Sequence, residues 1–256
     1  MAEKVHIIRS SDGVYELKID DAEGQNRLGD LVCEELQGAL TELTIDSDMR
    51  VLVLTGRPEV FCAGATLGVL RKLATGKALE DLGIPLLMLS FPGPILAALE
   101  GPAVGGGLAL AICCDILIAA EGARYGFNFT DMGFTPGMGT TSLLPAMTGH
   151  SFAMEMLLTA KYYKGRELKG RGIFSHVVRA DEVRGLTWDI ARAMAEKDRS
   201  VLEMVKDTLT MPRRLALQEA LSRERLMHKL SFGRPEIWSA ILESYRENNE
   251  GERESS

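Results

Sequence analysis

Short apolar runs separated by turn residues dominate the first half of the chain, and their periodicity predicts strands that alternate with helices. Alternating runs at 5–8 and 14–19 flank turn residues at 10–13, so they predict a β-hairpin. Between 28 and 43, leucine and valine recur at helical spacing. The remaining predicted elements are buried strands at 51–54, 94–99 and 116–119, and a helix at 108–113. Such alternation indicates an α/β core.

After about residue 140 the pattern becomes that of successive helices. Their spacing predicts helices at 151–158, 182–196, 201–209, 213–230 and 235–245. We therefore divide the chain into a core (1–198) and a C-terminal helical region (199–247). A polar tail at 248–256 is expected to be disordered, because it has too few apolar residues to pack.

Composition narrows the function mainly by exclusion. The chain has 256 residues, of which 46% are hydrophobic and 25% charged, which suits a globular protein with a sizeable core. Its formal net charge of -7 argues against binding to bulk nucleic acid or to an anionic membrane. The N-terminus lacks a signal-peptide core and no run approaches 18 apolar residues, so we expect a cytoplasmic protein.

Cysteine and histidine show no metal-binding pattern. No pair of cysteines has CxxC spacing, so buried thiols are expected at Cys33, Cys62, Cys113 and Cys114. Among the histidines, His6, His150 and His176 belong to no motif. We therefore predict no metal site.

Two glycine-rich turns follow predicted strands and carry the first candidate chemistry. FCAGAT, which contains Ala65, follows the strand at 51–54, and GPAVGGG, which contains Gly106, follows the strand at 94–99. Glycine lets backbone approach a ligand closely, and a helix opening at Gly106 presents free amides. Two amides converging from separate turns can bind a carbonyl oxygen and stabilise the enolate that it becomes. The simpler alternative is tight packing of both turns against the sheet.

At this point the sequence resembles the crotonase (enoyl-CoA hydratase/isomerase) family. The matching pieces are FCAGAT, GPAVGGG with LALAICCDILIAA, YGFNFTDMGFTPGMGTT, and AMEMLLTA followed by GRELKGRGIFSHVV. The resemblance implies an α/β spiral of repeated strand-strand-helix units with a C-terminal helical trimerisation region, and hence a homotrimer or hexamer. It also implies an oxyanion hole built by the backbone amides of Ala65 and Gly106. The acyl chain would be a thioester of a phosphopantetheine arm.

The chain departs from the hydratases of this family where they carry two glutamates that activate water. Ala109 and Phe129 stand at these positions, and neither side chain can move a proton. We expect both to line an apolar substrate pocket that excludes water. A hydratase or isomerase that uses Asp131 as a displaced acid remains an alternative. A catalytically silent protein that only binds acyl thioesters is another.

Three further segments, LATGKALED, GFTPGMG and RERLMHKLSF, are similar to the decarboxylases of polyketide β-branching cassettes. That branch acts on 3-methylglutaconyl groups carried by an acyl carrier protein. Carried over by position, its lysine falls on Lys77 and its histidine on His228. The lysine segment needs a small gap, so Lys72 remains a lesser candidate. Taken without the resemblance, Lys77 would be expected to be solvated and His228 to be a buried or capping residue.

The resemblance to this branch implies a carbon–carbon lyase. It would convert the 3-methylglutaconyl thioester, on an acyl carrier protein or on coenzyme A, to 3-methylcrotonyl thioester through an oxyanion-stabilised dienolate. Lys77 and His228 would orient the carboxylate and deliver a proton. No cofactor is implied, because the thioester carbonyl itself accepts the electrons released by the departing carboxylate.

Overall fold

The computed structural model describes residues 2–74, 83–234 and 236–253, with side chains as far as Tyr245. A six-stranded sheet has the order β1-β2-β3-β4-β6-β9. Its strands are β1 (Val5–Ile8), β2 (Val14–Ile19), β3 (Val51–Thr55), β4 (Ile95–Leu99), β6 (Ile116–Ala120) and β9 (His176–Val178). The pair β1 and β2 is the predicted antiparallel hairpin, and the other pairs are parallel. The second sheet joins β5 (Ala103–Val104), β7 (Arg124–Gly126) and β8 (Tyr163–Lys164).

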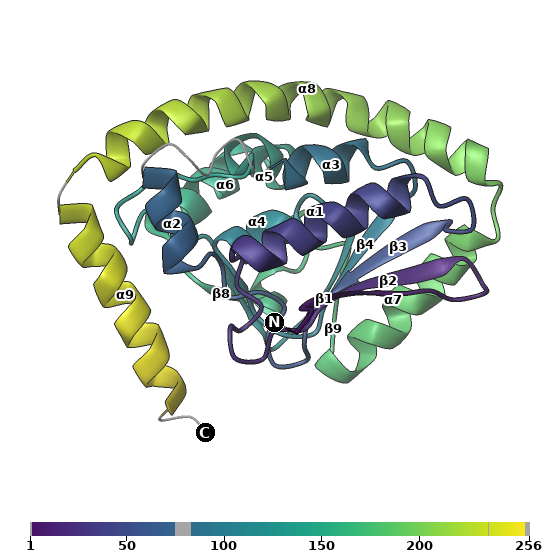
Figure 1. Ribbon diagram of the computed structural model, residues 1–256, viewed down its shortest axis with the longest axis horizontal. Helices are drawn as coiled ribbons and strands as arrows, with labels where there is room; N and C mark the ends of the chain where they lie inside the picture. Colours follow the sequence, from purple (N-terminus) through teal and green to yellow (C-terminus); the bar gives the residue numbers. More distant parts are fainter. Residues whose placement is uncertain (1, 75–82, 235, 254–256) are drawn as a thin grey trace.

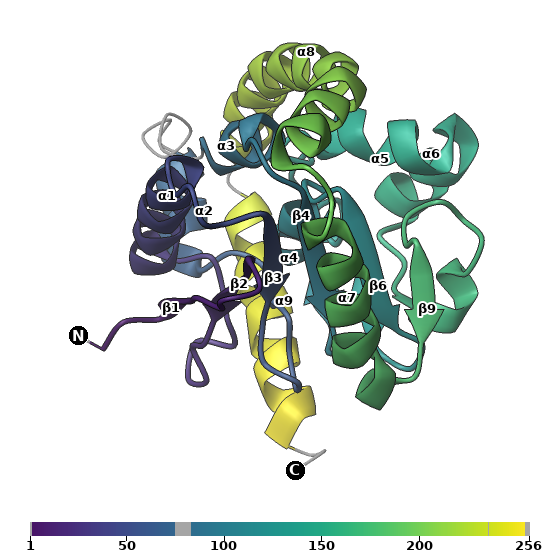
Figure 2. The same cartoon turned by 90° about the vertical axis from the view of Figure 1, so that its right-hand side faces the viewer.

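Helices cover both faces of the large sheet. The helices of the described residues, including those that do not pack on this sheet, are α1 (Asp30–Thr44), α2 (Leu67–Ala74), α3 (Ile84–Ser90), α4 (Gly106–Ala111), α5 (Thr140–Thr148), α6 (His150–Thr159), the 3-10 helix η1 (Gly165–Leu168), α7 (Ala180–Ala195), α8 (Arg199–Phe232) and α9 (Glu236–Arg253). Along β3, Leu52 and Leu54 belong to the main core, whereas Val51 and Val53 pack with residues of α7. This alternation follows from the two-residue period of a strand. Figure 2 shows α7 against one face, with α1 and α3 on the other side.

The long helix α8 arches over the molecule and packs on α3 and α5 (Figure 1). We predicted two helices here, at 201–209 and 213–230, and Pro212 lies in the interval between them. A proline lacks the amide hydrogen that a helix interior needs. That prediction was wrong, since α8 continues through Pro212. Contacts on both sides of the proline account for the continuity. Lys206 donates to the carbonyl of Gly93 at 2.7 Å, and Arg213 to that of Ile112 at 2.9 Å.

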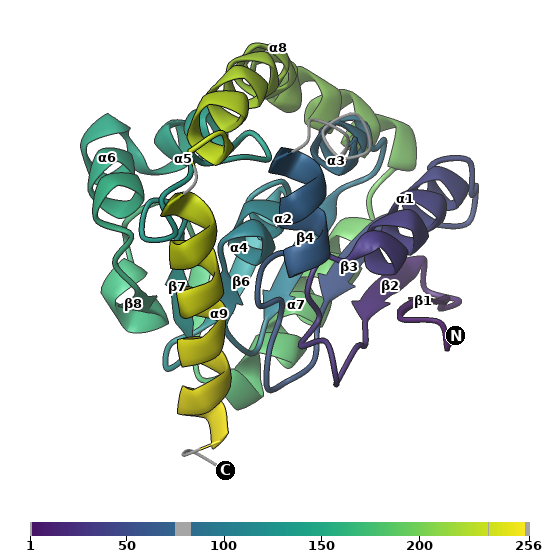
Figure 3. The same cartoon turned by 60° about the vertical axis from the view of Figure 1, so that its left-hand side comes forward.

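The last helix, α9, descends from the end of α8 at one side of the molecule (Figures 1 and 3). It continues to Arg253, so the stretch 248–253 that we expected to be a disordered tail is helical. Extension of a helix that has already begun at Glu236 needs no new nucleation step, so a polar sequence can continue it. The division at 198 coincides with the start of α8, where the Asp198 side chain accepts from the amide of Val201.

The structure bears on the predictions about the cysteines and about membrane-spanning segments. All four cysteines are buried free thiols, as predicted, and burial raises the pKa of Cys33, Cys62 and Cys113 to about 12. Among the described residues, no helix has the length and apolar character needed to cross a membrane.

Candidate active site

A cavity of about 690 Å³ lies where the two glycine-rich turns meet α2, α8 and α9. Ala65 and Gly106 both line it, as do Phe129 from the segment after β7 and His228 from α8. The lining also includes the apolar side chains of Val69, Leu70 and Leu73 from α2. Four of the residues singled out in the sequence are therefore brought together at one cavity.

The first turn is held by the chain segment before α1. The side chain of Asn26 donates to the carbonyls of Val60 and Phe61, each at 3.1 Å. Leu28 then forms a bridge to Ala65, in which the amide of Leu28 donates to the carbonyl of Gly64 at 2.8 Å. That carbonyl belongs to the same peptide group as the Ala65 amide, so the bridge fixes the direction of the amide.

The second turn packs directly on the first. The amide of Val104 donates to the carbonyl of Cys62 at 3.1 Å. A Cβ atom on Gly107 would lie only 2.2 Å from that same carbonyl oxygen, so this approach requires glycine. Gly106 opens α4, and its amide therefore has no partner within the helix.

The two candidate amides lie close to each other. A Cβ atom on Gly106 would lie 3.7 Å from the nitrogen of Ala65, and one on Gly64 would lie 3.9 Å from the nitrogen of Gly106. The two nitrogens therefore lie near each other, as a two-donor site for a carbonyl oxygen requires.

Phe129 and Ala109, which stand where the hydratases carry glutamates, are both apolar, but only Phe129 lines the cavity. Phe129 lines the cavity and packs edge-on against Phe134, with ring centroids 5.8 Å apart. Ala109 is fully buried within α4 and is not among the lining residues, so its effect on the cavity is indirect. Asp131 is exposed and is not a lining residue either. This placement gives no support to Asp131 as a displaced acid.

His228 is 3% exposed and sits at the cavity from the inner face of α8. Its Nε2 lies 2.8 Å from the carbonyl oxygen of Thr135. Because a carbonyl can only accept, Nε2 carries a proton, and Nδ1 of the neutral ring is an acceptor. That Nδ1 is buried and has no hydrogen-bond partner among the residues that the structure describes. Burial lowers the pKa of His228, while the backbone contacts to Thr135 and Pro136 oppose this change.

The two lysine candidates have different outcomes. Lys77 falls in the stretch 75–82, outside the described residues, so its position stays a prediction. Lys72 lies on α2, is half exposed, and forms an ion pair with Asp30 at 2.7 Å. It is not a lining residue of the cavity.

Sequence reasoning missed Tyr245, whose hydroxyl donates to the carbonyl of Ala65 from α9. Tyr245 lines the cavity, and burial raises its pKa to about 12. The guanidinium of Arg27 lies 5.5 Å from the centre of its ring. No motif marked this tyrosine, because the contact joins residues 180 positions apart.

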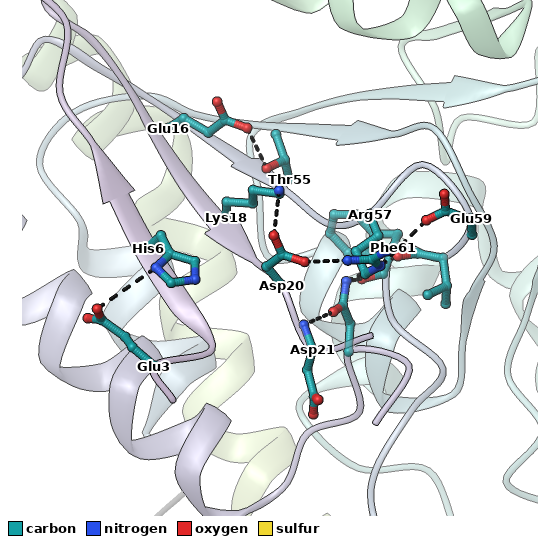
Figure 4. A network of polar contacts seen from close by, with 12 residues as sticks. Glu3, His6, Glu16, Lys18, Asp20, Asp21, Thr55, Arg57, Glu59 and Phe61 are labelled. Atoms are coloured by element: carbon teal, nitrogen blue, oxygen red, sulfur yellow. Dashed lines mark hydrogen bonds and ion pairs between the residues drawn. The ribbon is translucent and has the colours of Figure 1, made fainter. Parts of the chain in front are cut away.

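Arginines contribute positive charge to the cavity lining. Arg27, Arg57 and Arg124 are all lining residues. Figure 4 shows Arg57 between the carboxylates of Asp20, at 2.6 Å, and Glu59, at 3.5 Å. The exposed Arg124 lies 4.8 Å from the ring centre of Tyr162, another lining residue. These groups suit a ligand with an anionic part near the surface.

The mostly parallel sheet, the helices that flank it and the two glycine-rich turns at one cavity are those of a crotonase-type enzyme. The model of the family described as Enoyl-CoA hydratase/isomerase matches residues 9–251, so the chain belongs to this family. Its fold is the predicted α/β crotonase fold with a C-terminal helical region.

Similar proteins include decarboxylases. The bacillaene synthase decarboxylase PksI of Bacillus subtilis (strain 168) is 31% identical over 242 residues, which cover 94% of this chain and 97% of that protein. A structure of a dehydratase/decarboxylase enzyme couple involved in polyketide beta-branching has 30% identity and a TM-score of 0.88, covering 93% of this chain and 98% of that one. The ECH2 decarboxylase domain of CurF from Lyngbya majuscula has 29% identity and a TM-score of 0.87, covering 95% and 100%.

Proposed function

We propose that this enzyme decarboxylates a 3-methylglutaconyl-type thioester on an acyl carrier protein and releases the 3-methylcrotonyl thioester for polyketide β-branching. The observation that carries the proposal is the composition of the cavity. The amide nitrogens of Ala65 and Gly106 lie near each other at the cavity, and Phe129 in its lining stands where the hydratases carry a glutamate. The similarity to PksI and to the CurF domain supports the same reaction.

The amides of Ala65 and Gly106 bind the thioester carbonyl in this mechanism. When the carbon–carbon bond to the carboxylate breaks, carbon dioxide leaves and its bonding electrons move toward that carbonyl. The oxygen of the resulting dienolate gains negative charge, which the two amides stabilise. Removal of one such donor costs about 3–4 kcal/mol of transition-state stabilisation. The apolar surroundings strengthen these hydrogen bonds because water is excluded.

Lys77 and His228 supply the remaining chemistry in the proposal. One orients the carboxylate without neutralising it permanently, and the other returns a proton to the substrate carbon. Nδ1 of neutral His228 has no hydrogen-bond partner among the described residues, so it can take up a proton from solvent. The protonated ring can then orient the carboxylate or give that proton to the substrate carbon. The reaction consumes one proton and produces carbon dioxide, so it needs no oxidant and no electron carrier.

The anionic end of a phosphopantetheine arm would pass the arginines at the cavity. In this proposal Arg27 and Arg124, both lining residues of the cavity, bind its phosphate. Arg57, a third lining residue, forms ion pairs with Asp20 and Glu59. A guanidinium can bind a phosphate through two hydrogen bonds. Coenzyme A thioesters carry the same arm, so they compete for the site in this proposal.

The first prediction concerns water addition. Because Phe129 and Ala109 cannot activate water, we expect hydration of crotonyl-CoA to be negligible beside decarboxylation of the carrier-bound substrate. Loss of the general base alone accounts for roughly 10²–10⁴-fold in rate. The measurement is the decrease in absorbance of the enoyl thioester. Turnover at the rate of an ordinary hydratase would contradict the argument from these two residues.

The second prediction concerns assembly, and it rests on apolar side chains that a single chain leaves uncovered. Exposed ones on α8 include Val201, Met204, Val205, Leu209, Met211 and Leu215. Exposed apolar patches of this kind mark interaction surfaces. We therefore expect a homotrimer, or a hexamer made from two trimers, in light scattering at micromolar concentration. A Leu209→Arg variant, which places a charge on this apolar face, should lower the molecular mass of the assembly measured by light scattering. A monomeric wild-type protein would contradict the prediction.

The experiment that tests the proposed activity is incubation with the 3-methylglutaconyl-loaded carrier protein, followed by intact mass measurement of the carrier. The expected result is loss of carbon dioxide from the acyl arm.

A further inference from the structure

Glu224 is a buried carboxylate that the proposed mechanism does not use. It is 1% exposed and lies on α8 one helical turn before His228, on the same face. One carboxylate oxygen accepts from the amide of Gly139 at 2.8 Å. The other accepts from the amide of Thr141 at 3.0 Å and from its hydroxyl at 2.6 Å. A carboxylate buried to this extent is tolerated only when its oxygens are bonded in this way.

These contacts cap the N-terminus of α5 from a distant part of the chain. The helix begins after Gly139, and no side chain at its own start accepts a hydrogen bond from its free amides. Glu224 takes that role from 85 residues away. A negative charge at this end of a helix is also favoured by the helix dipole.

The turn before α5 needs such support because its backbone is strained. Met138 has a φ of 60°, a conformation that residues other than glycine rarely adopt, and Gly139 follows with a φ of 77°. A Cβ atom on Gly139 would lie 2.0 Å from the Leu217 side chain of α8, so the turn is pressed against that helix. Strained backbone persists only where its surroundings hold it.

The same turn reaches the candidate active site. Its Thr135 carbonyl receives the hydrogen bond from Nε2 of His228. A Cβ atom on Gly137 would lie 2.7 Å from Cε1 of His228, and Met138 lines the cavity. The sulfur of Met138 lies 3.6 Å from the place where a Cβ atom on Gly106 would stand. Two residues of one helix, Glu224 and His228, thus hold opposite ends of this turn.

We propose that Glu224 is a positioning residue for His228. By holding the end of the turn at Gly139 and Thr141, its carboxylate keeps the Thr135 carbonyl in line with the histidine ring. The ring then presents one nitrogen atom to the substrate in a fixed orientation. An effect of Glu224 on the reaction rate rests on the role proposed above for His228. An effect of Glu224 on the orientation of the His228 ring does not depend on that role.

The test compares Glu224→Gln with Glu219→Gln. The first variant keeps the shape of the side chain but places an NH₂ group against backbone amides, so one of the bonds to Gly139 or Thr141 is lost. The control residue lies on the same helix, is largely exposed, and pairs with Arg223 at 2.7 Å. Thr141→Val removes a single hydrogen bond and serves as the milder variant if Glu224→Gln does not fold.

Two readouts separate positioning from mere stability. We expect Glu224→Gln to lower kcat on the carrier-bound substrate by about tenfold or more with KM changed less than about threefold, and to cause no further loss in a His228→Ala background. Glu219→Gln should match the wild type. An equal loss in both backgrounds would overturn the proposal.

The second readout needs no turnover, so it holds even if the wild type proves not to be a decarboxylase. The chain has four histidines, and the signal of His228 in a proton NMR spectrum is identified by its absence in His228→Ala. Because the backbone contact to Thr135 raises the pKa of His228, its loss should move the titration midpoint further down in Glu224→Gln and in Thr141→Val. An unchanged midpoint in both folded variants would refute the positioning role.

Discussion

His228→Ala and Lys77→Ala each lower the rate of decarboxylation by roughly 10²–10⁴-fold in our account, the range that correctly placed acid–base groups contribute. For His228 the reason is its place at the cavity, with a buried Nδ1 that has no hydrogen-bond partner within residues 2–74, 83–234 and 236–245. Lys77 is included on the resemblance to the decarboxylases. The measurement is single-turnover loss of the acyl carboxylate, with circular dichroism to show that each variant is folded.

Lys72→Ala is the matched control for the lysine. Its ammonium is half exposed and paired with Asp30, outside the lining of the cavity, so this variant should retain close to the wild-type rate. If Lys77 and His228 act in one step, the double variant should be little worse than the slower single variant. Folded single variants with near-wild-type rates would contradict the proposed roles. An inactive Lys72→Ala with an active Lys77→Ala would instead transfer the lysine role to residue 72.

Gly105→Ala is expected to lower kcat by about 10²–10³-fold, which is the cost of displacing one oxyanion donor. Gly105 precedes the candidate donor Gly106 and has a φ of 53° with a ψ of -120°, where a side chain is strongly disfavoured. A Cβ atom there would also lie 2.6 Å from Oδ1 of Asn128. Relief of the backbone conflict requires movement of the turn, and the Gly106 amide moves with it.

Gly122→Ala is the control for this change, because no atom lies within 4 Å of its Cβ position and the residue is exposed. It should leave kcat unaltered. The decisive comparison uses folded protein, judged by thermal unfolding, at saturating substrate. A folded Gly105→Ala enzyme with the wild-type kcat would remove the second turn from the proposed oxyanion site.

Local patterns predicted the elements that depend on local interactions. The strands at β3, β4 and β6 and the two turns after β3 and β4 follow from apolar runs ending in glycine-rich segments, and the structure brings Ala65 and Gly106 to one cavity. The wrong division of α8 at Pro212 has a physical cause. A proline disfavours a helix locally, but packing on α3 and α5 and the anchoring of Lys206 outweigh that preference.

Contacts between distant residues could not be predicted in the same way. Tyr245 reaches Ala65 and Glu224 reaches Gly139 only after the C-terminal helices have folded over the core. Tyr245 belongs to no motif, and the RERLMHKLSF segment that contains Glu224 indicated a role for His228 alone. For Ala109 the family resemblance led to a different error. We expected this residue to line the substrate pocket, because the hydratases carry a glutamate at its position, but it is fully buried in α4 and does not line the cavity.

The central claim is most directly tested by the mass of the acyl carrier protein after incubation with this enzyme. The carrier is loaded with the 3-methylglutaconyl group, and the account predicts that its acyl arm loses carbon dioxide and becomes 3-methylcrotonyl, at a rate greatly reduced with His228→Ala. A carrier that is bound but keeps its mass would indicate a silent thioester-binding protein, and a gain of water would indicate a hydratase. Either of these two results would contradict the account.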